Sequence, residues 1–332
     1  MTRAVTLGLL VGIGVLIVGS TRAPMTERDA DFVLTRQIAE RVHDGQAYYP
    51  AYVEALSEVV TPPSQVRSVR LPIVGLVQSF APGAWVLLGA ALAGLSAGIA
   101  AKGWGPVGAV AIAAYMIPAS PEWLVYHELF ALPLGLAGLL AARRGDDLAA
   151  AGWLGLATVT REHFVLALVA AVLIRRAWPY LVAGSIAAMV YLAHTVAVTP
   201  LLSPDGYEMG YHVHFWPPQA YAYALAPGVG VAAIVLVGVV AAGLWRLWRS
   251  GAEPVTLGFV ALLGPLTMWS HRPYWYLMWA PLLFMHGLSL AGDTLSGLRA
   301  RALDRSGERG LPQRAQALPG DRVGVGVGSS GK

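Results

Sequence analysis

Long apolar runs separated by short polar turns dominate the chain, and their lengths set the expected fold. A membrane-spanning helix needs about 20 apolar residues, with a range of about 17–25. The run 71–80 is too short to span, so it predicts an interfacial or re-entrant piece. The runs that approach or reach the spanning length are 4–20, 84–100, 104–119, 123–141, 178–198, 227–245, 255–269 and 274–291. They predict an all-α fold, a polytopic transmembrane helical bundle.

The apolar stretch 148–174 is interrupted near its middle by Arg161 and Glu162. One continuous helix would place both charges mid-membrane, at a cost of at least about 2.5–3.5 kcal/mol each. It would also separate two arginine pairs, 143–144 and 175–176, which both favour the cytoplasmic side. We therefore expect a hairpin with Arg161 and Glu162 at its tip. Each arm of about 13 residues is about 20 Å long, so the tip should line a cavity open to the outer side.

This hairpin brings the total to about ten membrane segments, with both termini in the cytoplasm. Residues 1–302 form the expected transmembrane domain, with long outer loops at 21–70 and 199–226. Residues 303–332 are rich in Gly, Arg, Pro and Ser without apolar periodicity, which predicts a disordered cytoplasmic tail. The first run could be a signal peptide cleaved after Ala23, but the many later spans favour an uncleaved helix. The positive-inside rule is met by the basic residues of the short inner turns, Lys102, Arg143, Arg144, Arg175, Arg176, Arg246 and Arg249.

Composition supports a membrane location. A soluble domain carries about 25% charged residues, whereas this chain carries 13% and is 56% hydrophobic. We therefore expect a multi-pass protein of the cytoplasmic membrane. The net charge of +4 comes mostly from arginines in short loops and the tail, which indicates membrane topology rather than nucleic-acid binding. The absence of cysteine excludes disulfides, thiol catalysis and Cys-ligated metals.

The first outer loop opens with an unusually polar stretch, Asp29 to Tyr52. Its apolar positions approximate one helical face and Gly45 is a suitable stop, so we expect a short amphipathic surface helix. Asp29 and Asp31 stand at its start, two residues apart, and cannot point the same way. One account is helix capping, worth about 1 kcal/mol. The other account is that one carboxylate is a general base over an outer cavity while the other caps.

Other ionisable residues also fall on the outer side of this topology. Glu122 begins a helix, where a carboxylate interacts favourably with the helix dipole. Glu128 lies deeper in an apolar span, where capping does not explain it and an ionisable group is a functional candidate. Its neighbour His127 could be its hydrogen-bond partner. Arg161 and Glu162 could equally form a mutual pair.

The order of these parts resembles that of the GT-C membrane glycosyltransferases, in particular the polytopic bacterial mannosyl- and aminoarabinosyltransferases. The resemblance covers about residues 1–291. It rests on five segments in this order: an amphipathic helix with acidic residues, an arginine and a proline before an apolar run, an apolar span with acidic residues, a charged hairpin and a late outer turn. In this chain these segments read "DFVLTRQIAERVHDGQAYYP", "VRLPIVGLV", "PEWLVYHELFALPLGLAGLLAARR", "GLATVTREHFVLAL" and "HRPYWYLMWAPLLF".

The resemblance implies an inverting glycosyltransferase that moves a sugar from a polyprenyl-phosphate donor to an acceptor hydroxyl at the outer face. Asp31 maps onto the family's catalytic base, although many members carry an acidic pair where this chain has Asp31-Phe32, so Asp29 is the alternative. Outer-side arginines would bind the donor phosphate, because Arg contacts phosphate oxygens bidentately. The phosphate-binding candidates are Arg70, Arg161 and Arg272, and the cavity-lining candidates are Glu122, His127, Glu128 and Glu162. The sugar, the glycan, lipid or protein acceptor, and any divalent metal stay open.

Two other classes of function compete with this interpretation. A membrane transporter or lipid flippase would also need charged residues lining a cavity near the bilayer midplane. The clustering of polar groups on the outer side, with no balancing inner gate evident in the sequence, argues against it. A non-catalytic membrane scaffold would leave Glu128 and the charged hairpin tip without an explanation.

Overall fold

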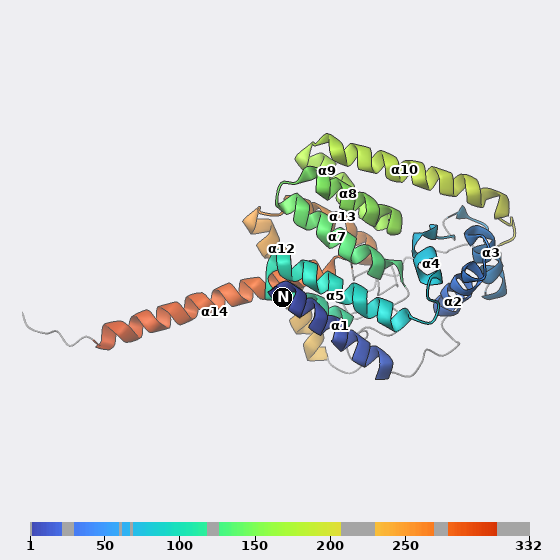
Figure 1. Cartoon of the computed structure of the whole chain (residues 1–332). Coiled ribbons are helices and arrows are strands. Elements are labelled where there is room, and N and C mark those ends of the chain that lie inside the picture. The colour runs from blue at the N-terminus through green and yellow to red at the C-terminus, as the bar shows by residue number, and fades with distance from the viewer. Residues whose placement is uncertain are drawn as a thin grey trace, which may run out of the picture. The chain divides into compact units, whose positions relative to one another are not determined.

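The computed structural model describes residues 2–21, 30–59, 62–66, 69–117, 126–206, 230–268 and 278–310 (Figure 1). Within these ranges the chain is helical, and none of them contains a β-strand, so the all-α fold is confirmed. The chain divides into two compact units, Met1–Leu290 and Ala291–Lys332. Helix α14, Ala280–Gly310, crosses this boundary and includes the first eight residues of the segment expected to be disordered. The rest of that segment lies outside the described residues.

Among the described residues, three helices are long and apolar enough to cross a membrane. They are α1 (Arg3–Thr21), α5 (Trp85–Trp104) and α10 (Trp178–Val198), which continues into the 3₁₀ turn η4 (Thr199–Leu201). Their surfaces carry large exposed apolar side chains, such as Leu87 and Leu192, and a face of this kind suits lipid rather than water. The chain therefore has the helices of a membrane protein, whereas the arrangement of about ten membrane segments stays a prediction.

The remaining helices coincide with the other apolar runs or lie in the first long loop. They are α2 (Ala30–His43), α3 (Tyr48–Val59), α4 (Pro72–Ser79), α6 (Pro106–Met116), α7 (His127–Arg143), α8 (Asp147–Thr160), η3 (Glu162–Phe164), α9 (Val165–Arg175), α12 (Gly230–Ser250) and α13 (Pro254–Met268). Several are shorter than a full span, and α4 has only eight residues. This length agrees with the interfacial or re-entrant piece expected at 71–80.

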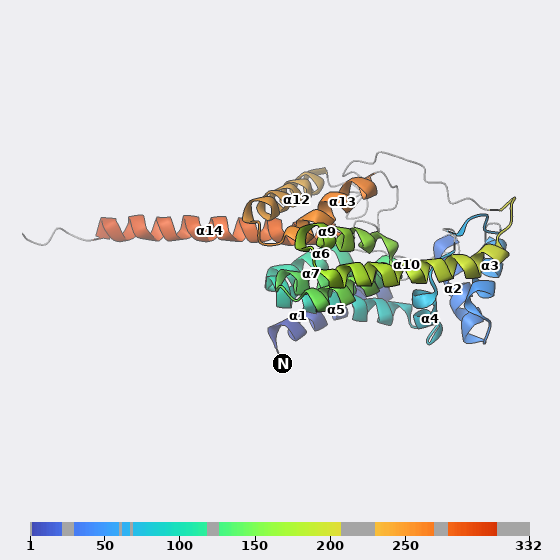
Figure 2. The ribbon, with the colours of Figure 1, turned by 90° about the horizontal axis from the view of Figure 1, so that it is seen from above.

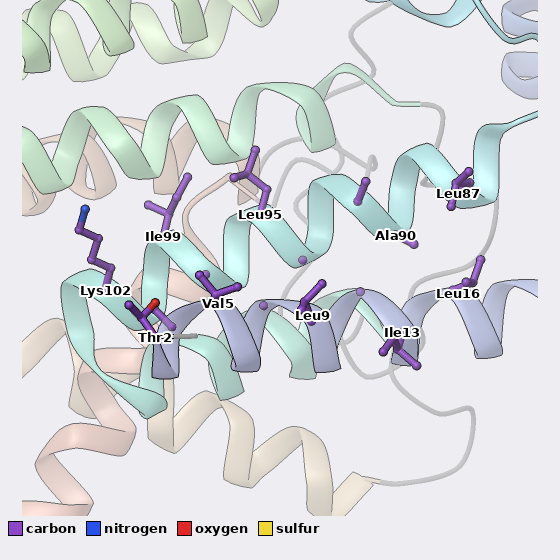
Figure 3. A pocket seen from close by; sticks show the side chains of 16 residues that line it. Thr2, Val5, Leu9, Ile13, Leu16, Leu87, Ala90, Leu95, Ile99 and Lys102 are labelled. Carbon is purple, nitrogen blue, oxygen red and sulfur yellow. The ribbon is translucent and has the colours of Figure 1, made fainter.

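Helices α1 and α5 pack through glycines spaced four residues apart. A Cβ added at Gly8 would lie 2.6 Å from the Gly94 carbonyl oxygen, and one added at Gly94 would lie 2.8 Å from the Gly8 carbonyl oxygen. Small residues at this spacing let two membrane helices bring their backbones together. A shallow apolar groove of about 770 Å³ follows the line where the two helices meet, with Thr2 and Lys102 at one end (Figure 3). It contains none of the candidate functional residues.

The hairpin expected at 148–174 is confirmed. Helix α8 ends at Thr160, Arg161 takes an extended conformation, and α9 returns after the single turn η3. Arg175 Nε then lies 3.0 Å from Asp147 Oδ1, so the two ends of the hairpin meet. The two arginine pairs therefore lie at the same end of the bundle, and Arg161 and Glu162 lie at the tip.

The first loop contains two helices where one was expected. Helix α2 ends before Gly45, whose φ of 95° is the left-handed conformation that a glycine stop favours. Helix α3 was missed, and it packs on α2 to form a small second core that includes Ile38, Tyr52 and Val198. Figures 1 and 2 show α2, α3 and α4 gathered at one end of the bundle, near the end of α10. The amphipathic helix α2 thus buries apolar side chains against other helices of the chain.

Candidate functional site

The structure describes the side chains of five of the nine candidate residues. These are Arg70, His127, Glu128, Arg161 and Glu162. Asp31 lies in the first turn of α2, but its side chain is outside the described part of the chain. Asp29, Glu122 and Arg272 also lie outside the described residues.

A buried ion pair joins Glu128 and Arg161. Glu128 stands in the first turn of α7, and Arg161 follows the last residue of α8. Arg161 Nε lies 2.6 Å from Glu128 Oε1, and each side chain is only 2% exposed. The partner of Glu128 is therefore Arg161, rather than its chain neighbour His127. Removing one member of such a pair takes a close opposite charge away from a buried charged group, which costs about 3–5 kcal/mol.

The pair extends outward through two more charged residues. Arg161 Nη1 donates a hydrogen bond of 2.8 Å to Glu162 Oε1, and Arg70 Nη1 donates to the same oxygen at 3.2 Å. Glu162 is 41% exposed and Arg70 is 21% exposed. We call Arg70, Glu128, Arg161 and Glu162 the tip cluster. It runs as an alternating series of charges from a fully buried carboxylate to a partly exposed guanidinium.

The charge state of Glu162 follows from its neighbours. Partial burial acts to raise the pKa of its carboxyl, but the Arg161 and Arg70 guanidiniums outweigh this effect and hold the pKa well below its usual range. Glu162 is therefore a carboxylate at neutral pH. His127 lies within electrostatic reach of Arg70 and Arg161, and its Nε2 is enclosed without a hydrogen bond to the described residues. The site thus combines fixed charges with an imidazole.

Neighbouring helices hold the tip cluster in place. The Tyr191 hydroxyl on α10 donates to the Thr158 carbonyl near the end of α8, at 3.1 Å. Directly after the cluster, Phe164 stacks on Phe259 of α13, with ring centroids 5.1 Å apart. The break between α8 and α9 is therefore anchored by a hydrogen bond from α10 and by ring packing from α13.

A second buried polar cluster lies at the opposite end of the bundle, and the sequence did not predict it. Glu253, 4% exposed, precedes α13, and its oxygens accept hydrogen bonds from Trp104 Nε1 at 3.0 and 3.2 Å. Arg143 Nη1 lies 3.4 Å and His286 Nε2 lies 3.6 Å from the same carboxylate. Burial acts to raise the pKa of Glu253, but hydrogen bonds and nearby positive charge outweigh burial and lower it, so the group stays ionised. We call these four residues the Glu253 cluster.

The sequence offered little signal for the Glu253 cluster. Its members come from four separate segments of the chain, and Glu253 directly precedes a proline without a sequence motif around it. Within the described ranges, no group of three or more His, Asp and Glu side chains is placed to hold a metal ion. A requirement for a divalent metal therefore stays open.

Comparison with known proteins adds no assignment. No model of a known protein family matches the chain, and neither a curated protein nor a solved structure matches it.

Proposed function

We propose that the protein is an inverting glycosyltransferase that transfers a sugar from a polyprenyl-phosphate donor to an acceptor hydroxyl at the outer face of the membrane. The observation that carries this proposal is the tip cluster. Three segments far apart in sequence bring four of the expected charged residues together, at the end of the bundle where α4 and α2 pack. A cluster of this kind, beside helices with exposed apolar surfaces, suits a substrate with a membrane-bound tail and a charged head group.

The exposure of the two arginines divides their roles. The phosphate leaving group needs positive charge, and Arg binds phosphate oxygens in a planar fork. Arg161 is enclosed and contacts two carboxylates, whereas Arg70 is 21% exposed and reaches the surface. In this proposal Arg70 contacts the phosphate, and Arg161 holds Glu162 and the tip in place. Sequence reasoning gave direct phosphate contact to both residues, and to Arg272.

Asp31 is the proposed base because of the helix that carries it. Helix α2 packs on α4, and α4 begins two residues after Arg70. The contact includes a hydrogen bond from His43 Nδ1 to the Ser79 carbonyl oxygen, at 2.8 Å. Asp31 is thus carried by a helix that is attached to the segment with the proposed phosphate ligand.

The proposed reaction balances without a cofactor. The Asp31 carboxylate takes the proton of the acceptor hydroxyl as that oxygen attacks the anomeric carbon. The bond from the anomeric carbon to the phosphate oxygen breaks, and polyprenyl phosphate leaves with the electron pair. Attack opposite the leaving group inverts the configuration at the anomeric carbon. Such general-base assistance contributes typically about 10²–10⁴-fold to the rate.

The test uses the full chain in lipid nanodiscs with a panel of polyprenyl-monophosphate sugars and envelope acceptors. The measurement is the release of polyprenyl phosphate together with formation of the glycosylated acceptor. Asp31→Asn should lower transfer by at least about 10²-fold while donor binding persists, because Asn still caps the helix. Arg36→Gln, on the same helix and 45% exposed, is the matched control and should retain activity. Failure of every donor to bind or react would reject the proposal.

A transporter is the second candidate, and the Glu253 cluster favours it. Alternating access requires that each end of a cavity can be closed in turn. The sequence showed no inner gate to balance the polar groups of the outer side, whereas the structure has a buried ionic cluster at each end. Movement of a labelled lipid-linked sugar across a vesicle membrane without any covalent change would support the transporter. Covalent transfer by the same preparation would support the glycosyltransferase.

A further inference from the structure

Two helix ends lie side by side at the end of the bundle opposite the tip cluster. They are the C-termini of α7 and α9, each of which carries a pair of arginines. Arg175 of the second pair contacts Asp147, which follows the first pair in the chain, through Nε and Oδ1 at 3.0 Å. A Cβ added at Gly145 would also lie 3.5 Å from Arg175 Nη2. These contacts join the turns 143–147 and 175–178 into one surface, which we call the arginine end.

In each pair the first arginine is engaged within the protein. Arg143 contacts Glu253 and donates to the Gly103 carbonyl oxygen at 2.8 Å, and Arg175 contacts Asp147. The second arginine of each pair, Arg144 or Arg176, is exposed and forms no ion pair with any residue that the structure describes. Among the described residues, two guanidiniums of the arginine end are therefore not engaged in an ion pair.

The backbone at Arg176 is strained. Its φ of 54° and ψ of 29° place it in the left-handed region, and no other non-glycine residue in the described ranges has a positive φ. The turn after α7 places a glycine, Gly145, in the same kind of conformation. Glycine or asparagine would fit position 176 with less strain. A charged side chain at a strained position is an observation that favours a functional role for that side chain.

The surface beside these arginines is apolar. Trp178 is 68% exposed, and Leu148 and Leu173, on the adjoining turns of α8 and α9, are 69% and 67% exposed. Tryptophan favours the head-group level of a bilayer. A soluble anion or an acidic peptide would use the guanidiniums but would leave these three side chains in water. A ligand with an anionic head and apolar chains matches the whole surface.

We propose that Arg144, Arg176 and Trp178 bind the head group of an anionic phospholipid in the leaflet that this end faces. The two guanidiniums contact the phosphate oxygens, the indole packs at the head-group level, and the acyl chains lie along Leu148 and Leu173. Basic surfaces between membrane helices bind anionic lipid head groups in this way. Asp146 is the acidic residue nearest to Arg144 in the sequence, and its side chain caps α8 by accepting a hydrogen bond from the Ala149 amide at 3.1 Å. The proposal requires membrane embedding but not glycosyltransferase activity.

The experiment measures thermal unfolding of the full chain in a neutral detergent with added lipid. Phosphatidylglycerol should raise the midpoint above the value reached with phosphatidylcholine of the same chain length. Arg144→Gln and Arg176→Asn should each weaken the apparent affinity for phosphatidylglycerol about fivefold, as expected for one basic residue at a membrane surface. Without lipid, Arg176→Asn should unfold at or above the wild-type temperature, because Asn tolerates the left-handed conformation.

The control is Arg36→Gln, an exposed arginine at the other end of the bundle, which should leave the lipid effect unchanged. Equal stabilisation by both lipids would overturn the proposal, as would wild-type affinity in the Arg144→Gln/Arg176→Asn double variant. Equal stabilisation by glycerol 1-phosphate would replace the lipid site with a site for free phosphate esters. If Arg176→Asn does not fold, Arg176→Gly and the single variant Arg144→Gln provide the same comparison.

Discussion

Replacing Glu128 with leucine should severely destabilise the protein. Both members of the Glu128–Arg161 pair are 2% exposed, so the value of about 0.2–1 kcal/mol typical of surface pairs does not apply. The variant would leave the Arg161 guanidinium buried beside an apolar side chain, with Glu162 as its remaining carboxylate contact. We expect a loss of about 3–5 kcal/mol, which corresponds to a fall of about 6–20 °C in the unfolding midpoint. Thermal unfolding in detergent, followed by circular dichroism, measures this change.

The double variant Glu128→Leu/Arg161→Met separates the pair's net contribution from the penalty of an unpaired charge. A buried ion pair replaced by apolar side chains of similar volume often costs little, so the double variant should recover most of the stability that Glu128→Leu loses. The exposed pair of Arg36 and Glu40, 3.6 Å apart, provides the control. Glu40→Gln should change stability by less than about 1 kcal/mol. A loss this small in Glu128→Leu would show that the pair is solvated, and a double variant as unstable as the sum of the singles would refute the pairing.

Three further predictions follow from the fold and the charges. Gly94→Val should lower the free energy of unfolding by about 1–3 kcal/mol, because its Cβ would lie 2.8 Å from the Gly8 carbonyl oxygen. Gly184→Ala, with open space around it, should be neutral or stabilising. Equal stability of the two variants would exclude close α1–α5 packing. Reporter fusions after residues 147 and 177 should both read cytoplasmic, and opposite readings would contradict the hairpin. The folded-state pKa of Glu162 is lowered, so the stability that this carboxylate contributes is present above its unfolded pKa of about 4.3 and is lost as the pH falls through the folded-state pKa. The unfolding midpoints of wild type and Glu162→Gln, measured across that acidic range, should therefore converge at the lowest pH. Parallel curves would contradict the lowered pKa.

Part of the candidate site could be predicted because its physics is local. The cost of Arg161 and Glu162 in an apolar helix, together with the two flanking arginine pairs, was enough to predict the hairpin from the sequence. The end of α2 at Gly45 follows in the same way from the residue that tolerates a positive φ. Each inference uses the solvent preference or backbone freedom of residues close together in the chain.

The pairings were decided only by the tertiary structure. His127 was the sequence candidate for the partner of Glu128, yet the packing of α7 against α8 presents Arg161 instead. Helix α3 was missed because its apolar face has a partner only when it packs on α2 and α10. The Glu253 cluster, the engagement of one arginine in each pair and the strain at Arg176 were not visible in the sequence either. Hydrophobic periodicity and the free-energy cost of burying a charge are properties of one segment and its solvent. Ion pairs between helices depend instead on how each helix is rotated about its axis against its neighbours, and that rotation is set only when the helices pack together.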